Sequence, residues 1–486
     1  MSKEAIEGLK PEALWQRFYE ITQIPRPSKK EEKIREYLKN LASQFKVPSK
    51  EDEVGNIVIN IAATPGYESS PTVVLQGHVD MVCEKNKGTE HDFDNDPLKI
   101  KREGDWITAE GTTLGSDNGI GVASGLALLT DKSFAHGPIE LLFTIDEETG
   151  MTGVENLKPG FITGKTLLNL DSEEDGAFYV GCAGGQDTQA DYKIEFTSEV
   201  AGYTPFTLMI SGLKGGHSGM EIILGRCNAI KALARTLKKL EATDLLISNI
   251  EGGSKRNAIP REAEATVLLK SAKDAEKIVK DFEAKLQQEF KTTDPGLKIT
   301  LSQKSESVSK AFSKAFQNKL VNVLLGLPHG VIAMSPDIPG LVETSTNLAT
   351  LNTNNDTLTI GTSQRSSVES AKKYIAESVA SVFELSGAKV SQGDGYPGWK
   401  PNLDSEVLKV ASKLFENLFN KKPEVKAIHA GLECGILGNK YPGLDMISFG
   451  PTIEGAHSPD ERVNIPAVER FYKLLSAILT DFANRK

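Results

Sequence analysis

The feature that most constrains this chain is the apolar run Val-Val-Leu-Gln-Gly-His-Val-Asp at residues 73–80. Such a run is typical of a buried strand, and it ends in His78 and Asp80. Side chains at i and i+2 of a strand point to the same side, so an imidazole and a carboxylate lie together. In an open α/β sheet, functional groups gather outside the carboxyl ends of the strands. A carboxylate beside a histidine suits a metal ligand with its orienting partner, so the run predicts a metal site.

Strands and helices alternate around this run. We expect strands at 56–61, 139–145 and 165–170, and helices at 11–24, 28–45 and 118–129. Ser28 and Glu31 have the spacing of a capping box, which predicts that they begin the second helix. The alternation indicates an α/β fold, with a mostly parallel sheet flanked by helices.

The pattern changes near residue 188. The order β-α-β-β-α-β, which is ferredoxin-like, is expected from strands at 206–211, 245–250, 263–269 and 297–301 and helices at 228–240 and 272–290. Residues 304–390 resemble an imperfect second copy. Glycines and prolines from 393 to 401 mark a linker, after which strands and helices alternate again. We therefore expect a principal domain in two parts, 1–188 and 393–486, with an α+β lid and dimerisation domain, 189–392, inserted between them.

Composition excludes several classes of protein. Lys and Arg number 56 against 66 Asp and Glu, a net charge of −10, which argues against a nucleic-acid partner. No apolar run is long enough to span a bilayer, and the N-terminus has no signal-peptide core, so we expect a cytoplasmic protein without a membrane partner. The four cysteines are scattered, which indicates neither a disulfide framework nor a thiolate zinc site.

Other acidic residues and a histidine follow predicted strands or begin predicted helices. They are Asp117 in Gly-Ser-Asp-Asn-Gly, Glu147 and Glu148 in Asp-Glu-Glu-Thr-Gly, Asp171 in Asn-Leu-Asp, and His457 in Gly-Ala-His-Ser. Each motif alone is more typical of a turn, a cap or a structural pair. Together, two histidines and three carboxylates suit a two-metal site, with zinc, cobalt or manganese favoured over calcium or copper.

These motifs, with Gly-Gly-His-Ser-Gly at 215–219, resemble the M20 family of di-zinc peptidases over essentially the whole chain. The best match is the aminoacyl-histidine dipeptidase branch, also called cytosolic non-specific dipeptidases. The resemblance implies two divalent ions, most simply zinc, bridged by Asp117. One ion would also be held by His78 and Asp171, and the other by Glu148 and His457.

The resemblance implies further roles around the metals. Asp80 would orient His78, and Glu147 would be the general base. The peptide bond between Asp117 and Asn118 would be cis. His217 would stabilise the oxyanion, from its own or a partner subunit, although a glycine-rich surface loop is the alternative for that segment.

The resemblance also suggests residues that contact the substrate. Arg365 would bind the substrate carboxylate, a bidentate task that suits arginine. Asn257 resembles a lid asparagine at the substrate, and His429 and Glu433 would line the pocket from the catalytic-domain side. His91, His136 and His329 have no motif around them, and we interpret them as surface or structural residues.

The expected function is hydrolysis of unblocked dipeptides with broad specificity, including Xaa-His substrates such as β-alanyl-histidine, by a homodimer. A tripeptidase or aminopeptidase of the same family is the first alternative, and an N-acyl-amino-acid deacylase is a further one. A metal-binding scaffold without catalysis is the alternative of another class. Such a scaffold should have lost Glu147 or a ligand, whereas every position is filled here.

Overall fold

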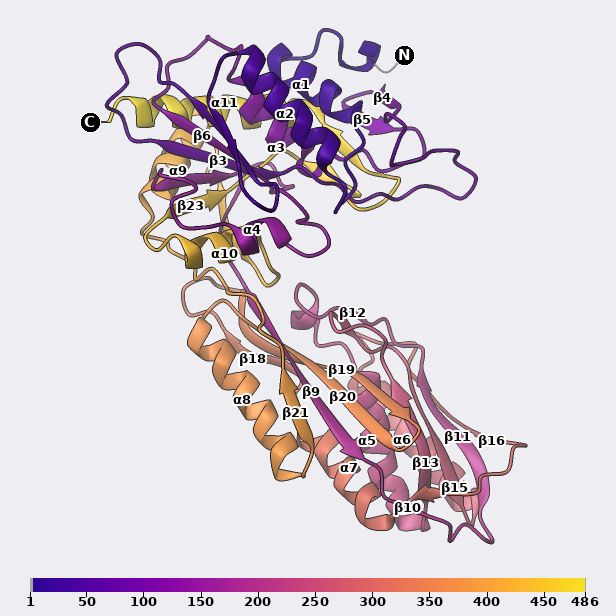
Figure 1. The fold of residues 1–486 in the computed structure, drawn as a ribbon. Coiled ribbons are helices and arrows are strands. Elements are labelled where there is room, and N and C mark those ends of the chain that lie inside the picture. The colour runs from indigo at the N-terminus through magenta and orange to yellow at the C-terminus, as the bar shows by residue number, and fades with distance from the viewer. Residues whose placement is uncertain (1–2, 486) are drawn as a thin grey trace. The chain divides into compact units, whose positions relative to one another are not determined.

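The computed structural model describes residues 3–485, which form two compact units (Figure 1). The first unit comprises the residues up to Gly181, residues 401–427 and those from Leu432 onward. The second, which we call the lid unit, comprises residues 182–400 and 428–431. The domain limits expected from the sequence, 188/189 and 392/393, lie close to these divisions but do not coincide with them.

The first unit is built on an eight-stranded sheet of order β1-β2-β6-β3-β7-β23-β8-β22. The central strands β6, β3, β7 and β23 are parallel, whereas the β1–β2, β2–β6 and β23–β8 pairs are antiparallel. Every residue of β3 and β6 is buried, as the continuous apolar runs of parallel strands require. The predicted α/β class is confirmed, and the parallel part of the sheet is its centre.

The strands of this unit are β1 (Ser49–Glu51), β2 (Ile57–Ile61), β3 (Val73–His78), β4 (Ile100–Glu103), β5 (Trp106–Ala109), β6 (Ile139–Thr144), β7 (Thr166–Asn169), β8 (Ala177–Cys182), β22 (Glu424–Ile428), β23 (Asp445–Ser448), β24 (Ile453–Glu454) and β25 (Arg462–Asn464). Its helices are η1 (Lys3–Ile6), α1 (Glu12–Thr22), α2 (Glu32–Gln44), α3 (Ser116–Ala127), α4 (Thr152–Asn156), α9 (Glu406–Phe419), α10 (Glu433–Lys440) and α11 (Ile465–Ala483). A second sheet, of order β24-β25-β5-β4, is antiparallel.

The predicted capping box before α2 is wrong. The helix begins at Glu32, and its N-cap residue, Glu31, makes no side-chain cap hydrogen bond. The hydroxyl of Ser28 instead donates to Asp80 Oδ2 at 2.7 Å, and Glu31 Oε1 accepts from the Lys29 amide. A hydrogen bond to an ionised carboxylate is stronger than one between neutral groups. Ser28 therefore bonds to Asp80 just after β3 and does not cap the helix.

The lid unit contains a nine-stranded sheet of order β16-β11-β15-β13-β19-β20-β9-β21, with β18 paired to β19. Its strands are β9 (Gly184–Lys193), β10 (Phe196–Thr197), β11 (Thr204–Ser211), β12 (Gly216–His217), β13 (Leu246–Gly252), β14 (Ala258–Ile259), β15 (Ala263–Leu269), β16 (Lys298–Gln303), β17 (Ala311–Phe312), β18 (Gly330–Met334), β19 (Val342–Asn354), β20 (Thr357–Ser366) and β21 (Lys389–Gln392). Its helices are η2 (Ile222–Leu224), α5 (Ala229–Leu240), η3 (Glu241–Thr243), α6 (Ala272–Glu289), α7 (Lys314–Gly326) and α8 (Glu369–Leu385).

The predicted ferredoxin-like unit is present as β11-α5-β13-β15-α6-β16, whose strands are antiparallel neighbours in the sheet (Figure 1). A second such unit is formed by β9-α7-β19-β20-α8-β21. Its first strand, β9, comes before every element of the first ferredoxin-like copy in the chain. The second copy is therefore not confined to 304–390. The two halves join where Gly252 of β13 pairs with Leu351 of β19, which lets one sheet and one buried core serve both.

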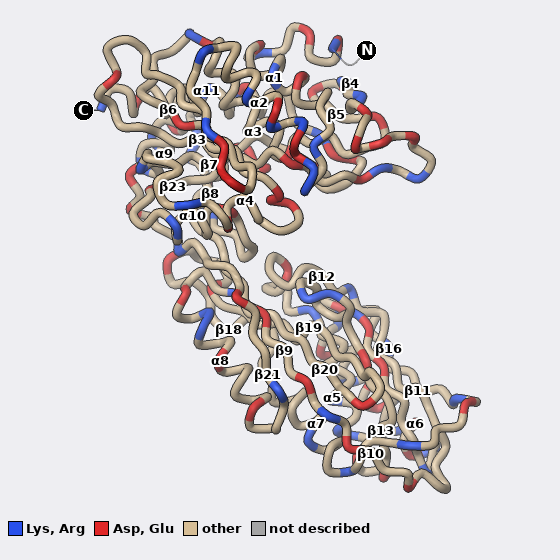
Figure 2. Tube along the Cα trace, in the orientation of Figure 1, with Lys and Arg blue, Asp and Glu red and all other residues tan. Residues whose placement is uncertain are grey.

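Acidic and basic residues are interspersed along the traces of both units (Figure 2). Within the described residues 3–485, the helices include none with the length and apolar character needed to cross a membrane.

Candidate metal centre

The metal-binding residues expected from the sequence meet at one edge of the first unit's sheet. Strand β3 ends at His78, whose neighbour in β6 is Thr144, and β7 lies on the other side of β3. Because these strands are parallel, the segments that follow them, with Glu148 and Asp171, leave the sheet at the same edge. Asp117 lies in the first turn of α3 and His457 in the loop between β24 and β25.

Asp117 lies between two groups of ligand atoms. Its Oδ1 is 3.1 Å from His78 Nε2, which is 3.2 Å from Asp171 Oδ1. Its Oδ2 is 3.2 Å from His457 Nε2, which is 3.1 Å from Glu148 Oε2. Two ligands held about 2.0–2.1 Å from a tetrahedral ion are roughly 3.3 Å apart, so each group has the spacing of a coordination shell. Glu148 Oε1 and Asp171 Oδ1 are also buried without hydrogen-bond partners, which fits atoms that bind cations.

The electrostatics of this cluster also fit cations. Burial raises the pKa of Asp171 to about 8. Burial, with the neighbouring charges of Asp117 and Asp171, likewise raises that of Glu173 to about 8. Hydrogen bonds to Asp117 and Glu148 raise the pKa of His457 to about 11. Positive charge between these carboxylates would stabilise their ionised forms and lower their pKa values, so the donor set is matched to divalent cations.

Asp80 holds His78 and the acidic turn together. Its Oδ1 is 3.4 Å from His78 Nδ1, on the ring edge opposite the ligand nitrogen. The same carboxylate accepts hydrogen bonds from the Glu147 amide at 3.1 Å and the Glu148 amide at 3.2 Å. Asp80 is fully buried, so these contacts fix the His78 ring and the start of the turn at once.

The turn that carries Glu147 and Glu148 is shaped by Asp146. This residue has a positive φ of 52°, and its carboxylate accepts from the hydroxyls of Thr149 and Thr152. Glu147 lies with His78 and Glu148 in a further group of close ligand atoms, and burial raises its pKa well above the usual range. A carboxyl group with a raised pKa, beside these candidate ligand atoms, is suited to accepting and releasing a proton.

The loop that carries Asp117 is fixed by two buried charged residues that the sequence analysis missed. Glu461 accepts hydrogen bonds from the Leu114 amide at 2.7 Å, the Gly115 amide at 2.9 Å and the Ser116 amide at 2.7 Å. Arg26 donates from Nη2 to the Gly115 carbonyl and from Nη1 to the Asp80 carbonyl. Both are almost completely buried, and together they tie the Asp117 loop to the segments that carry Asp80 and His457.

The Asp117–Asn118 peptide bond is cis, as the resemblance implied. Asn118 donates from Nδ2 to the Leu170 carbonyl at 2.6 Å, and its Oδ1 lies against Gly77. A methyl group at Gly77 would lie 2.2 Å from that oxygen. Only glycine therefore fits directly before His78, which explains the Gly-His-Val-Asp motif.

His217 lies in the lid unit, in the short strand β12, which pairs with β14. Its Nδ1 accepts hydrogen bonds from the amides of Gly219 at 3.2 Å and Met220 at 3.1 Å. The ring hydrogen of the neutral form is therefore on Nε2. Burial and the charge of Arg365 lower the pKa of His217, so near neutral pH it is an uncharged donor.

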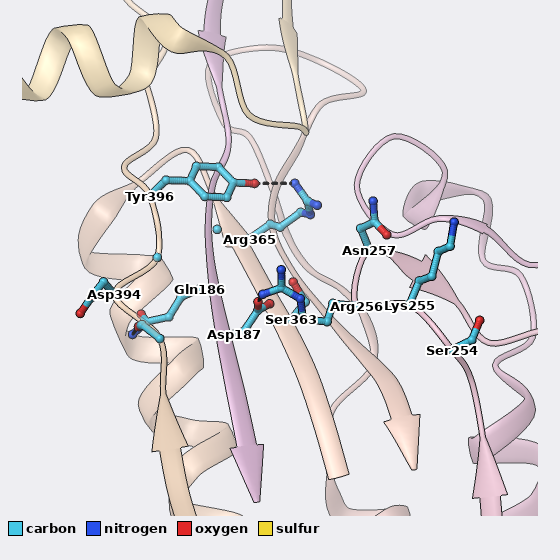
Figure 3. Close-up of a pocket in the computed structure, with 13 residues that line it drawn as sticks. Gln186, Asp187, Ser254, Lys255, Arg256, Asn257, Ser363, Arg365, Asp394 and Tyr396 are labelled. Atoms are coloured by element: carbon cyan, nitrogen blue, oxygen red, sulfur yellow. Dashed lines mark hydrogen bonds and ion pairs between the residues drawn. The ribbon is translucent and has the colours of Figure 1, made fainter. Parts of the chain in front are cut away.

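Arg365 lies at the end of β20 and is 7% exposed. It lines a cavity of about 650 Å³ together with Asn257 and Tyr396 (Figure 3). Figure 3 shows its guanidinium directed toward the Tyr396 hydroxyl, while Asn257 comes from a neighbouring loop. Its Nε is buried without a hydrogen-bond partner.

His429 and Glu433 do not share one environment. His429 belongs to the lid unit, not to the catalytic-domain side as expected, because its Nε2 lies 2.7 Å from Ser345 Oγ and its segment packs on lid residues. Glu433 belongs to the first unit and is buried, where it accepts from Gln76 Nε2 at 2.6 Å and Thr144 Oγ1 at 2.9 Å. Glu433 therefore supports β3 and β6 from within the unit.

The missed residues give little local signal. Glu461 follows His457 by four positions in His-Ser-Pro-Asp-Glu-Arg, a pattern typical of an exposed acidic turn. Arg26 lies between two prolines. Tyr396 lies in what reads as a linker. A charged or aromatic residue among turn-forming residues was the available clue, and it does not specify a partner.

Comparisons with known proteins agree with this geometry. Residues 74–481 match the model of peptidase family M20/M25/M40. The chain is 41% identical over 479 residues to the cytosol non-specific dipeptidase of Escherichia coli (strain K12), covering 98% of this chain and 99% of that protein. Its structure matches that of the aminoacylhistidine dipeptidase from Vibrio alginolyticus with a TM-score of 0.92 and 41% identity, over 99% of each chain.

A more distant match shows how widely the fold is shared. The aminopeptidase PepT from Bacillus cereus ATCC 10987 superposes with a TM-score of 0.59 at 18% identity, over 98% of this chain and 100% of that one. The family match and the full-length relative identify the family without reference to that structure. The chain belongs to peptidase family M20/M25/M40.

Proposed function

We propose that this protein is a metal-dependent dipeptidase that hydrolyses unblocked dipeptides with broad specificity, including Xaa-His substrates. The observation that carries the proposal is the pair of ligand groups joined by Asp117, with the carboxyl group of Glu147 beside them. The full-length similarity to a protein named as a non-specific dipeptidase supports the choice of substrate.

We propose that His78, Asp117 and Asp171 hold one divalent cation, and Asp117, Glu148 and His457 a second, with zinc the first choice for this mixture of ligands. Bound cations at such a site lower the pKa of a water molecule and polarise a carbonyl group. Asp80 keeps the His78 ring oriented, and Arg26 and Glu461 keep Asp117 at its position.

Glu147 is the proposed general base. Its carboxylate takes the proton from the attacking water and returns it to the leaving amine. In the lid unit, His217 donates from Nε2 to the developing oxyanion, and Arg365 and Asn257 bind the terminal carboxylate of the dipeptide. His429 and Glu433 are proposed to act on the substrate only indirectly, through the residues that they contact.

The test is hydrolysis of a substrate panel by the purified protein. The panel contains β-Ala-His, Gly-His, Leu-Gly, a tripeptide and an N-acetyl amino acid, each with zinc, cobalt or manganese and after chelation. Metal-dependent cleavage restricted to the dipeptides is the expected result. Cleavage of the tripeptide alone would identify a tripeptidase, and cleavage of the N-acetyl amino acid a deacylase. No cleavage by metal-loaded protein would favour a scaffold.

We also propose that the protein is a cytosolic homodimer. The location follows the name of the E. coli relative. The dimer is supported by exposed apolar side chains on η2, on the loop before it and on β18, and the elements η2 and β18 are neighbours. These side chains are Met220, Ile223, Leu224, Val331, Ile332 and Met334, each 37–56% exposed. Light scattering on the eluting protein measures the mass directly, and a monomer would contradict this assignment.

A further inference from the structure

The cavity beside Arg365 contains hydrogen-bond donors that lack an acceptor. Arg365 Nη1 donates to Tyr396 Oη at 2.9 Å. A guanidinium has no lone pair to offer, so the phenol is the acceptor in this bond and its own O–H remains available. The hydrogen bonds among residues 3–485 include none donated by that hydroxyl, and Arg365 Nε is buried without a partner. An almost buried guanidinium and a free phenol hydrogen at one cavity are the complement of an anionic oxygen pair.

The position of Tyr396 is fixed by its surroundings. Its ring fits between two glycines, since a methyl group would lie 2.6 Å from the ring at Gly185 and 2.9 Å at Gly431. Its amide donates to the Gly185 carbonyl at 2.9 Å, and its carbonyl accepts from Lys372 Nζ at 2.7 Å. The hydroxyl is thus held at the cavity in advance, which reduces the ordering cost of binding a ligand.

The protonation state of the phenol suits a donor. Burial raises the pKa of Tyr396, although the charge of Arg365 opposes the shift. The hydroxyl therefore keeps its hydrogen throughout the neutral range.

We infer that Tyr396 is a specificity-determining residue: its hydroxyl donates a hydrogen bond to the substrate carboxylate and holds the Arg365 guanidinium in the orientation that binds the same group. The inference rests on the proposed function, because it assigns the residue to the recognition of a dipeptide's free C-terminus. It also explains why the chain places a tyrosine among the glycines and prolines of the segment 393–401.

The test is Tyr396→Phe, which removes the hydroxyl and leaves the ring between its glycines. A hydrogen bond to a charged group contributes enough to change binding by about 10- to 100-fold. We expect kcat/KM for Leu-Gly to fall by that factor, mainly through KM. Cleavage of Leu-Gly amide, which has no carboxylate, should fall less than cleavage of Leu-Gly does, by about two- to tenfold at most, because only a neutral hydrogen bond can be lost there.

Tyr192→Phe is the matched control, because Tyr192 is in the same unit and its hydroxyl contacts Ser386 at 2.6 Å rather than the cavity. This variant should leave the ratio of Leu-Gly cleavage to Leu-Gly amide cleavage unchanged.

An equal loss on both substrates in Tyr396→Phe, with a lowered urea midpoint, would show a purely structural role and overturn the inference. No loss on Leu-Gly would overturn it too. Wild-type protein that cleaves no dipeptide would overturn the proposed function and this inference together, whereas an active wild type with an unaffected variant overturns the inference alone.

Discussion

Replacing Glu461 by glutamine tests whether the Asp117 loop is held by one buried carboxylate. Glu461 is 2% exposed. Its Oε2 accepts from the amides of Leu114 and Gly115, and its Oε1 accepts from the amide and hydroxyl of Ser116 and, at 3.3 Å, from the Asp117 amide. Glutamine keeps one oxygen and turns the other into an NH₂ group. Whichever way the amide is oriented, backbone donors on one side face another donor.

The magnitude follows from the bonds lost. Hydrogen bonds to a charged acceptor contribute about 1.5–3 kcal/mol each, and at least two are lost in either orientation, since Oε2 accepts two and Oε1 accepts three. Removing a buried charge offsets part of this cost, so we expect the free energy of unfolding to fall by about 3 kcal/mol. Since Asp117 follows directly in the same loop, affinity for zinc should fall by roughly 10- to 100-fold, as for other residues that support metal ligands.

The assays are urea unfolding of the chelated protein and calorimetric titration with zinc. Glu454→Gln is the control. Glu454 ends β24, directly before the loop that carries Glu461, but it is about half exposed and pairs with Arg462 at the surface. That variant should lose less than about 1 kcal/mol. If Glu461→Gln behaved like Glu454→Gln, the reasoning would be refuted. Lost stability with unchanged zinc affinity would show that the carboxylate stabilises the fold without positioning Asp117.

Three further predictions follow from the same structure. Glu147→Gln should abolish most turnover while retaining bound metal, whereas Glu148→Gln should lose metal; equal metal contents by elemental analysis would contradict the division of roles. Chelation should lower the melting temperature, because cations that bind the folded state stabilise it, and an unchanged value would argue against the metal centre. Burial lowers the pKa of His329 from its ordinary 6.5 to about 4, so the unfolded chain binds more protons between these values. Stability should therefore fall as pH drops through this window, by at most about 3 kcal/mol, and His329→Gln should flatten the urea-unfolding profile; an unchanged slope would assign the loss to other groups.

The local pattern of the chain was enough to predict most elements. The apolar runs of β3 and β6 and the spacing of α5 and α6 predicted strands and helices close to the observed bounds. The order of motifs along the strands also predicted that His78, Asp117 and His457 would meet, because the carboxyl ends of parallel strands share an edge.

Other features depended on partners far away in sequence. Ser28 has the spacing of a helix cap but bonds to Asp80, and the strand β9 pairs with β20 and completes a unit whose other elements follow it by more than a hundred residues. The sequence around Glu461 predicts an exposed acidic residue, yet the amides that donate to its carboxylate are some 345 positions earlier in the chain. The sequence by itself determined which segments form strands and helices and which chemical groups stand at their ends, since those depend on neighbours along the chain. The tertiary structure alone decided which buried donor meets which acceptor, because burial leaves each polar group to be satisfied by whatever the fold brings beside it.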